Sequence, residues 1–247
     1  GGKSVMVYSP FWGSKPATIL FKYFSQFLKT LLLLFRERPK VVFVMTPPTV
    51  ACVAVWIYCS VFGRKFVIDA HTGAFVDGPW ERLLFLHKFF SRRAATTVVT
   101  SQHFRDMIEG WGARADIVTD VPVYFAKPED YPLKAEKNMA LVCSFTFDEP
   151  IELFFDAASR LSEITFHLTG NYKKLPAEIV AKKPANVIFT GFLEDAQYVG
   201  LLTACDAVIS LTNCDHTMQR GAYEAIYLEK PVVTSDFGIL RDAFPEG

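Results

Sequence analysis

The sequence contains few features of metal-binding, disulfide-stabilised or nucleic-acid-binding proteins. Its five cysteines form no Cys-x-x-Cys pair, so neither a zinc ribbon nor a disulfide framework is predicted, and reduced thiols in the cytoplasm are expected. The five histidines share no predicted helix face and no Asp-x-Asp follows a predicted strand, so no metal or other cofactor is expected. The 26 basic and 26 acidic side chains cancel, which argues against nucleic acid as a partner.

The longest apolar run, residues 41–63, is too short to predict a transmembrane helix. Pro47 and Pro48 interrupt it and leave fifteen residues between Thr49 and Gly63. Because a helix needs about 20 residues to span a bilayer, this segment is predicted to be a buried helix. The 247 residues are 51% hydrophobic and include 23 Phe, which is enough for a sizeable core.

Short apolar runs alternate with helical patterns along the chain, which is typical of βαβ units and predicts an α/β protein with parallel sheets. The predicted strands are Ser4–Tyr8, Val41–Met45, Lys65–Ile68, Thr96–Thr100, Asp116–Thr119, Met139–Cys143, Thr165–Thr169, Asn186–Thr190, Ala207–Leu211 and Pro231–Thr234. The predicted helices are Ala17–Arg36, Thr49–Val61, Trp80–Arg93, Ser101–Trp111, Pro150–Leu161, Ala196–Cys205 and Gln219–Leu228.

The segment 122–137 contains three prolines and six charged residues, a composition typical of an interdomain linker. It separates an N-terminal domain, residues 1–121, from a C-terminal domain, residues 138–247. We predict two Rossmann-like, doubly wound parallel-sheet domains that face each other across a cleft. Ligands of such sheets bind at the carboxyl ends of the strands, so the loops that follow strands hold the candidate site.

Asp69 and His71 follow the predicted strand that ends at Ile68. A carboxylate and an imidazole two residues apart can act as orienting group and base toward an incoming hydroxyl group. The alternative is that Asp69 caps a turn and His71 only packs. Asp69 and His71 are therefore the candidate catalytic residues.

Three turns in the C-terminal domain are predicted to approach a phosphorylated ligand. Ser144 lies near a helix start, where unpaired N–H groups favour an anion; an ordinary helix cap is the alternative. A glycine directly after a buried strand lets a ligand come close to the backbone, and this pattern occurs in two consecutive units. The candidates in these two turns are Thr169, Gly170, Asn171, Gly191, Phe192 and Leu193.

The richest polar cluster joins the strand 207–211 to the last predicted helix. Arg220 and the N–H groups at the helix start can bind a diphosphate together. Glu224 lies one turn further, where its carboxylate can accept hydrogen bonds from two ribose hydroxyl groups. The alternative is an ordinary i,i+4 pair between Arg220 and Glu224. The candidate binding residues here are His216, Thr217, Gln219, Arg220, Gly221 and Glu224.

These segments resemble the GT-B glycosyltransferases, in particular family four and its relatives. The resemblance covers most of the chain and is strongest over the turn TGN, VIFTGFL, YVGLLTACD and HTMQRGAYEAIYLEKPVVTSD. It implies a metal-independent, hexosyltransferase-like enzyme whose C-terminal domain holds a nucleotide-diphosphate sugar, with UDP or GDP as the expected nucleotide. Family four has two glutamates eight positions apart. The second matches Glu224, whereas His216 occupies the first position, so retention or inversion stays open.

In the other domain, DAHTGAF resembles the acceptor-side loop of the same enzymes. The resemblance implies a lipid-linked or glycan acceptor in polysaccharide or glycoconjugate synthesis. It also implies that relatives have a strand and helix before Ser4 and helices after the last strand, so a truncated chain is expected. Two alternatives stay open: a catalytically silent subunit that binds nucleotide or a partner, and a sugar-nucleotide 2-epimerase of the same fold.

The two halves of the chain differ in charge. Residues 1–133 contain 16 Lys and Arg against 10 Asp and Glu, and residues 134–247 contain 10 against 16. Basic amphipathic helices bind anionic lipid, so the helices Ala17–Arg36 and Trp80–Arg93 predict a peripheral position on the inner face of the membrane. The alternative is that both helices pack on the sheet. The apolar stripe of the first helix is Leu20, Phe24, Phe27, Leu28, Leu31, Leu34 and Phe35.

Overall fold

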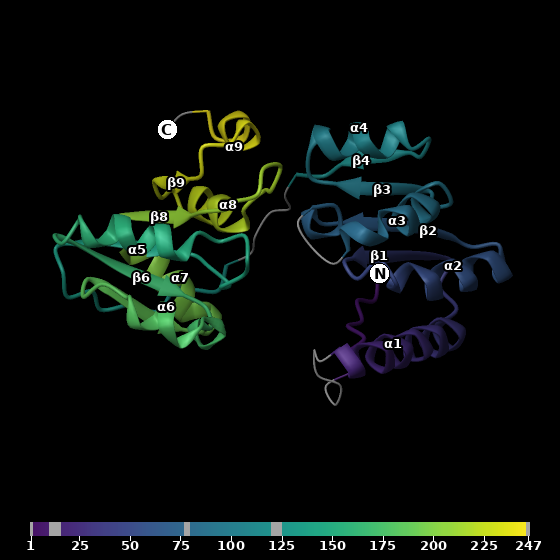
Figure 1. Ribbon diagram of the computed structural model, residues 1–247, viewed down its shortest axis with the longest axis horizontal. Helices are drawn as coiled ribbons and strands as arrows, with labels where there is room; N and C mark the ends of the chain where they lie inside the picture. The colour runs from purple at the N-terminus through teal and green to yellow at the C-terminus, as the bar shows by residue number, and fades with distance from the viewer. Residues whose placement is uncertain (1, 10–15, 77–79, 120–124, 246–247) are drawn as a thin grey trace. The chain divides into compact units, whose positions relative to one another are not determined.

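The computed structural model describes residues 2–9, 16–76, 80–119 and 125–245. The chain forms two compact units, Gly1–Thr119 (unit 1) and Asp120–Gly247 (unit 2), which are drawn in Figure 1. Both are parallel α/β folds, so the predicted α/β class with two parallel-sheet domains is confirmed. The first residues of the predicted linker 122–137 lie outside the described residues.

Unit 1 is built on a four-stranded parallel sheet, sheet A, whose strands follow the chain in the order β1-β2-β3-β4. The strands are β1 Val41–Thr46, β2 Lys65–Ala70, β3 Thr96–Val99 and β4 Ala115–Ile117. The helices are α1 Pro16–Glu37, α2 Ala51–Phe62, α3 Leu84–Ser91 and α4 Gln102–Gly110, with 3-10 turns η1 Thr72–Ala74 and η2 Glu81–Leu83.

The two faces of β1 differ in burial. Side chains alternate across a strand, and Val44 enters the core formed with α2, α3 and α4. On the other face Val41, Phe43 and Met45 are 50%, 71% and 60% exposed. One face of β1 is therefore apolar and open among the described residues.

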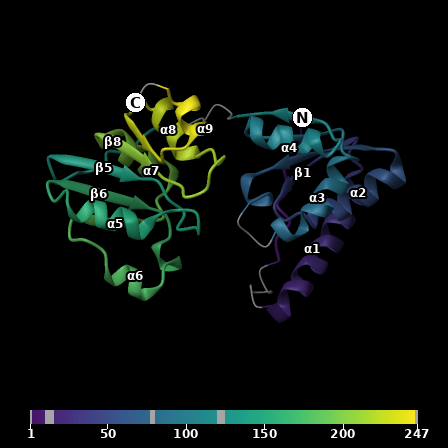
Figure 2. The same ribbon diagram turned by 45° about the horizontal axis from the view of Figure 1, so that its top comes forward.

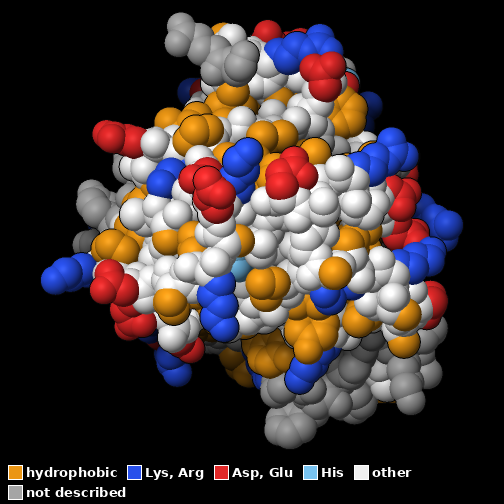
Figure 3. Space-filling view, turned by 90° about the vertical axis from the view of Figure 1, so that its left-hand side faces the viewer, with side chains coloured by type: hydrophobic (Ala, Val, Ile, Leu, Met, Phe, Trp, Pro, Cys, Tyr) orange, Lys and Arg blue, Asp and Glu red, His pale blue; other side chains and the backbone are white. Residues whose placement is uncertain are grey.

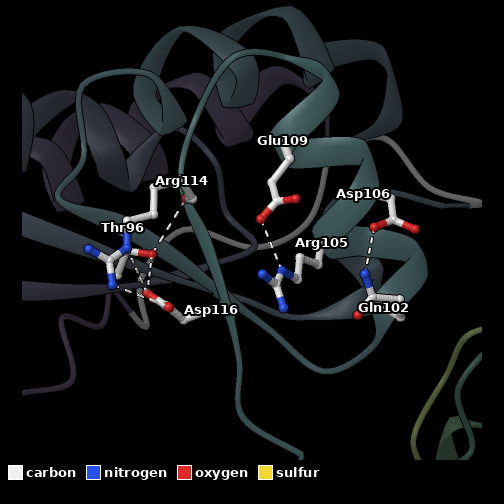
Figure 4. Close-up of polar contacts among 7 residues, drawn as sticks. All are labelled: Thr96, Gln102, Arg105, Asp106, Glu109, Arg114 and Asp116. Atoms are coloured by element: carbon white, nitrogen blue, oxygen red, sulfur yellow. Dashed lines mark hydrogen bonds and ion pairs between the residues drawn. The ribbon is translucent and has the colours of Figure 1, made fainter.

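The opposite edge of sheet A is polar. Thr96 of β3 donates a hydrogen bond to Asp116 of β4 at 2.7 Å, and Arg114 pairs with the same carboxylate at 3.3 Å. Figure 4 shows these contacts beside the two i,i+4 pairs of α4, Arg105 with Glu109 and Gln102 with Asp106. Charged side chains at a sheet edge oppose pairing with another strand.

Helix α1 lies beside α2, at the end of unit 1 away from α4 (Figures 1 and 2). Leu34 is buried, and Phe35 contacts the rings of Tyr58 and Phe62. Of the predicted stripe, Leu20, Phe24, Leu28 and Phe35 are exposed, so the stripe packs only in part. By length and composition, Thr18–Glu37 qualifies as a candidate membrane span, with a mean hydropathy of 1.3.

Unit 2 is built on a five-stranded parallel sheet, sheet B, in the order β7-β6-β5-β8-β9. The strand order reverses between β5 and β8, which makes that point the topological switch of a doubly wound sheet. The strands are β5 Lys137–Leu141, β6 Ile164–Thr169, β7 Val187–Gly191, β8 Ala207–Ser210 and β9 Val232–Thr234. The helices are α5 Ile151–Ser159, α6 Ala177–Ala181, α7 Asp195–Ala204, α8 Arg220–Tyr227 and α9 Gly238–Ala243, with the 3-10 turn η3 Tyr172–Lys174.

Sheet B is covered on both faces. Leu141 and Ile209 join one core cluster with α5, whereas their neighbours Ala140 and Val208 join a second cluster with α7 and α8. Because successive residues of a strand point to opposite faces, the two clusters lie on the two sides of the sheet. This double covering explains why every residue of the inner strand β8 is buried.

Several predicted elements need correction. The strand predicted at Ser4–Tyr8 is wrong: residues 2–9 have no regular secondary structure, and Met6 is exposed. Strand β2 continues past Ile68 to Ala70, so Asp69 lies within the strand and not after it. The helix predicted over Trp80–Arg93 begins as the 3-10 turn η2, and Phe90 of α3 is buried in the core. The short helices α6 and α9 were not predicted.

Replacing Gly200 with alanine is expected to lower the free energy of unfolding by about 1–3 kcal/mol through overpacking. Gly200 lies in α7, and a Cβ there would be 2.1 Å from the backbone oxygen of Glu129. Chemical denaturation measures the loss. Gly110 of α4 is the matched control, because a Cβ there meets nothing within 4 Å. Equal stability of the two variants would contradict the close packing at Gly200.

Candidate functional site

The loops that follow the strands of sheet B are joined at the carboxyl end of the sheet. The N–H of Asn213, after β8, donates to the carbonyl of Asp148, after β5, at 2.6 Å. The N–H of Gly170, after β6, donates to the carbonyl of Gly191, the last residue of β7, at 3.0 Å. The loops after β5 and β8, the two strands that flank the topological switch, are therefore joined to each other, and sheets of this kind bind ligands at that point.

Ser144 is exposed in the loop after β5, and its backbone N–H and carbonyl are hydrogen-bonded to other side chains. Its N–H and that of Thr146 donate to the carboxylate of Glu149 at 2.8 and 2.9 Å, and Lys174 donates to its carbonyl at 2.7 Å. Burial and the nearby Asp148 raise the pKa of Glu149, against the effect of these N–H groups. An internal carboxylate therefore takes the backbone donors that the sequence assigns to a phosphate, which leaves the Ser144 hydroxyl for a ligand.

The turn after β6 contains one buried candidate and two that reach the surface. Thr169 is buried, and its hydroxyl bridges to the backbone of Leu141 and Cys143 at 3.4 Å. Gly170 has φ +89°, and a Cβ would be 2.3 Å from the carbonyl oxygen of Cys143. Asn171 is exposed and accepts a hydrogen bond from the N–H of Lys173. In this turn Gly170 brings two loops together, and Asn171 faces solvent.

The turn after β7 is open. Gly191 has φ +74°, and a Cβ there meets nothing within 4 Å. Phe192 is 81% exposed, whereas the next residue, Leu193, packs against the core on the α7 side. An exposed aromatic ring beside an open glycine can stack on a planar or cyclic ligand.

The segment between β8 and α8 has an unusual backbone. His216 adopts φ +59°, and its N–H donates to Asp215 at 2.6 Å. The hydroxyl of Thr217 is buried and has no hydrogen-bond partner among the residues that the structure describes. Gln219 accepts a hydrogen bond from Ser210 at 3.3 Å, which ties the start of α8 to β8. A Cβ on Gly221 would be 2.9 Å from Val142, so this glycine lets α8 lie close to the sheet.

Arg220 and Glu224 form the predicted i,i+4 pair on α8, with Nε and Oε1 3.0 Å apart. The Arg220 side chain is 66% exposed and that of Glu224 is 12% exposed. The second carboxylate oxygen, Oε2, accepts a hydrogen bond from the Tyr198 hydroxyl at 2.6 Å. Burial and the Glu224 charge raise the pKa of Tyr198, so it stays a donor. The surface-pair alternative is therefore incomplete, because a third residue on α7 joins the pair.

In unit 1, Asp69 lies in β2 and His71 is the first residue after that strand, directly before η1. Oδ2 of Asp69 is 3.7 Å from Nε2 of His71, and both side chains are about half exposed. Interaction with the Asp69 carboxylate raises the pKa of His71, although partial burial opposes the shift. This separation is within the range of an ion pair and longer than a hydrogen bond.

Three residues close to the candidate site were not predicted as part of it: Glu149, Lys174 and Tyr198. Lys174 and Tyr198 contact residues far away in sequence, and Glu149 contacts backbone N–H groups. Contacts of these kinds produce no local sequence motif. A cavity of about 450 Å³ lies beside the β5 loop. Its lining includes Phe145, Phe147 and Lys174 but none of the predicted binding residues.

Figure 3 views the molecule from the side on which Figure 1 shows unit 2. On this face, basic and acidic side chains are interspersed.

Within the described ranges, no group of three His, Cys, Asp or Glu side chains is arranged to hold a metal ion. The candidate residues therefore form two separate groups, the joined loops of unit 2 and the Asp69–His71 pair of unit 1.

Two family models match this chain, one in each unit. The model of the glycosyl transferase 4-like domain matches residues 4–123, and that of glycosyl transferases group 1 matches residues 136–247. The chain therefore belongs to the glycosyltransferases of the GT-B class, with a 4-like domain followed by a group 1 domain. A comparison with curated proteins gives no match.

Solved structures of the same fold cover nearly the whole chain. Sucrose-phosphate synthase from Thermosynechococcus elongatus is 14% identical with a TM-score of 0.70, over 95% of this chain and 65% of that protein. Anabaena HepE in complex with UDP and glucose is 17% identical with a TM-score of 0.69, over 88% and 64%. A UDP-N-acetylglucosamine 2-epimerase-like protein from Listeria monocytogenes is 12% identical with a TM-score of 0.58, over 98% and 68%. The chain thus spans about 65% of the first two structures, and at these identities the likeness establishes the fold.

Proposed function

We propose that this protein transfers a hexose from a UDP or GDP sugar to the hydroxyl group of a lipid-linked or glycan acceptor, without a metal ion. The observation that carries the proposal is the Arg220–Glu224 pair on α8, which offers a guanidinium and a carboxylate next to the joined loops that follow β5 and β8. The membership in GT-B glycosyltransferases supports the reaction class. The binding of UDP by the HepE protein makes UDP the first nucleotide to test.

The donor diphosphate is proposed to bind the N–H groups at the start of α8 together with Arg220. A guanidinium has five N–H donors, and the bond to Glu224 uses the one on Nε. The N-terminal end of a helix favours an anion through its unpaired N–H groups and its dipole. Diphosphate charge is thus neutralised by protein groups.

Glu224 is proposed to accept hydrogen bonds from the ribose. A carboxylate has about four lone-pair sites, and Tyr198 and Arg220 take one on each oxygen. One site per oxygen remains, which matches the two hydroxyl groups of a ribose. Of the other candidates, the Ser144 hydroxyl, Asn171 and His216 are proposed to contact the diphosphate or sugar, and Phe192 the base. Gly170 and Gly221 are proposed to let the loops approach the donor.

In the transfer step the acceptor oxygen attacks the anomeric carbon of the donor sugar. The bond from that carbon to the diphosphate oxygen breaks and its electron pair leaves with the diphosphate. His71, oriented by Asp69, is proposed to take the hydroxyl proton. Arg220 and the start of α8 stabilise the charge that develops on the leaving group.

A thermal-shift panel with UDP, GDP, TDP and ADP sugars tests the donor assignment. A ligand that binds the native state raises the unfolding midpoint by mass action, and we expect UDP or GDP sugars to do so. Release of free nucleotide with an acceptor, compared with its absence, then separates transfer from hydrolysis, epimerisation or silent binding. No shift with any of the four sugars would overturn the proposal.

We further propose that α1 attaches the protein to the inner, cytoplasmic face of the membrane, where a lipid-linked acceptor for polysaccharide synthesis is held. Phe21, Phe24 and Leu32 of α1 are exposed, and basic residues on the same helix favour anionic lipid by about 1 kcal/mol each. The helix lies against α2 through Leu34 and Phe35, which supports attachment along the surface.

Co-sedimentation with vesicles is expected to favour anionic over neutral lipid at low salt, with release at high salt. Replacing Phe21 and Phe24 with serine should abolish binding, whereas Leu153→Ser, an exposed apolar position on α5, should not. Equal binding to both vesicle types would remove the electrostatic part of the proposal, and retention at high salt would favour insertion of α1.

A further inference from the structure

The carboxylate of Glu224 is held by two residues from different elements. Tyr198 of α7 reaches Oε2 from 26 positions earlier in the chain, and Arg220 of α8 reaches Oε1 from one turn away. The two contacts are unequal, because the Arg220 side chain is mostly exposed whereas Tyr198 packs against the core cluster of α7, α8 and β8. The Tyr198 contact is therefore the less screened of the two.

A carboxylate that is only 12% exposed needs partners, because burying an unpaired charge is costly. The Tyr198 hydroxyl supplies one at 2.6 Å, a distance typical of a charge-assisted hydrogen bond. A phenol on a rigid ring can also fix the plane of the carboxylate, since the ring has few rotamers and is packed on the core.

We propose that Tyr198 is a positioning residue that fixes the Glu224 carboxylate in the orientation in which it accepts the donor ribose. This role rests on the proposed donor site and adds a residue to it. Tyr198 itself does not touch the ligand. It acts by holding Oε2, so that the remaining lone pairs of Glu224 point away from α7 toward the ligand.

The alternative is that Tyr198 only stabilises the packing of α7 on α8. The two roles differ in what they do to recognition of the ribose. A positioning residue changes the discrimination between UDP and 2′,3′-dideoxy-UDP, whereas a packing residue changes the stability and affects both nucleotides equally. The conservative variant Tyr198→Phe removes the hydroxyl and keeps the ring.

Isothermal titration of the chain with UDP and with 2′,3′-dideoxy-UDP, or the GDP pair if GDP binds, decides between them. We expect the wild type to prefer the ribonucleotide. Tyr198→Phe should reduce that preference by about tenfold, the scale of one hydrogen bond to a charged group. Affinity for the dideoxy nucleotide should stay unchanged. An unchanged preference in Tyr198→Phe would overturn the role.

A double-mutant cycle gives a second readout. If Tyr198 acts through Glu224, adding Tyr198→Phe to Glu224→Ala should cause no further loss of UDP affinity, and an additive loss would overturn the proposal. Tyr58→Phe is the matched control, because the Tyr58 hydroxyl is also buried and bonded, to Pro39 in unit 1. It should leave the preference unchanged. A wild type that binds neither nucleotide overturns the donor site itself, which is distinct from binding without a Tyr198 effect.

Discussion

Replacing His71 with alanine is expected to lower turnover about 100-fold or more, the usual cost of losing a general base. His71 has the Asp69 carboxylate 3.7 Å away and is half exposed, so it can reach an acceptor hydroxyl from solvent. Steady-state rates with a saturating donor and an acceptor measure the effect. His103→Ala is the control, since His103 lies on α4 in the same unit. A loss of only a few-fold in His71→Ala would assign the base elsewhere.

The pH dependence gives a sharper test of the same pair. Interaction with Asp69 raises the pKa of His71, and only the neutral imidazole can take a proton. Activity should therefore rise as the pH passes upward through the pKa of His71. Asp69→Asn removes the negative charge and lowers that pKa, so the acidic limb of kcat/KM should move to lower pH while the maximum falls. An unmoved limb would show that Asp69 does not act on the titrating group.

Much of the fold could be predicted because the strands are local in sequence. Strand β8 begins with a run of apolar residues, and its predicted and observed ends agree within one residue. The segment at Ser4–Tyr8 also contains apolar residues but pairs with no strand in the described part of the chain, and a strand depends on its neighbour for hydrogen bonds. Whether a segment pairs with another strand depends on residues far from it in sequence. The local pattern does not contain that information, so this strand prediction was wrong.

In the candidate site, too, contacts between residues close in sequence could be predicted and contacts between distant residues could not. Arg220 and Glu224 could be predicted as a pair because one helical turn fixes their separation. Glu149 could not be assigned, because its role depends on N–H groups of a loop that folds back on it. Tyr198 lies 26 positions from its partner, so only the packing of α7 against α8 brings the two together.

Glu224→Ala is expected to weaken the binding of a UDP or GDP sugar by about 1–3 kcal/mol, or roughly 5- to 150-fold. The carboxylate is 12% exposed and its two partners leave one lone-pair site on each oxygen for the ribose. Titration of wild type and variant with the same nucleotide sugar measures the loss. Equal affinities would remove the ribose role.

The same substitution has a second, opposite effect that makes the test specific. Without Glu224, Arg220 loses the negative charge 3.0 Å from its Nε and carries an uncompensated positive charge at the start of α8. Attraction for a diphosphate should then stay equal or increase, while contact with the ribose is lost. We therefore expect Glu224→Ala to weaken uridine or guanosine binding but not pyrophosphate binding. Arg220→Gln, the matched variant, should weaken pyrophosphate binding and spare the nucleoside. If Glu224→Ala lowered both affinities in parallel, the change would be a general loss of the α8 structure, and circular dichroism of the variant would show it.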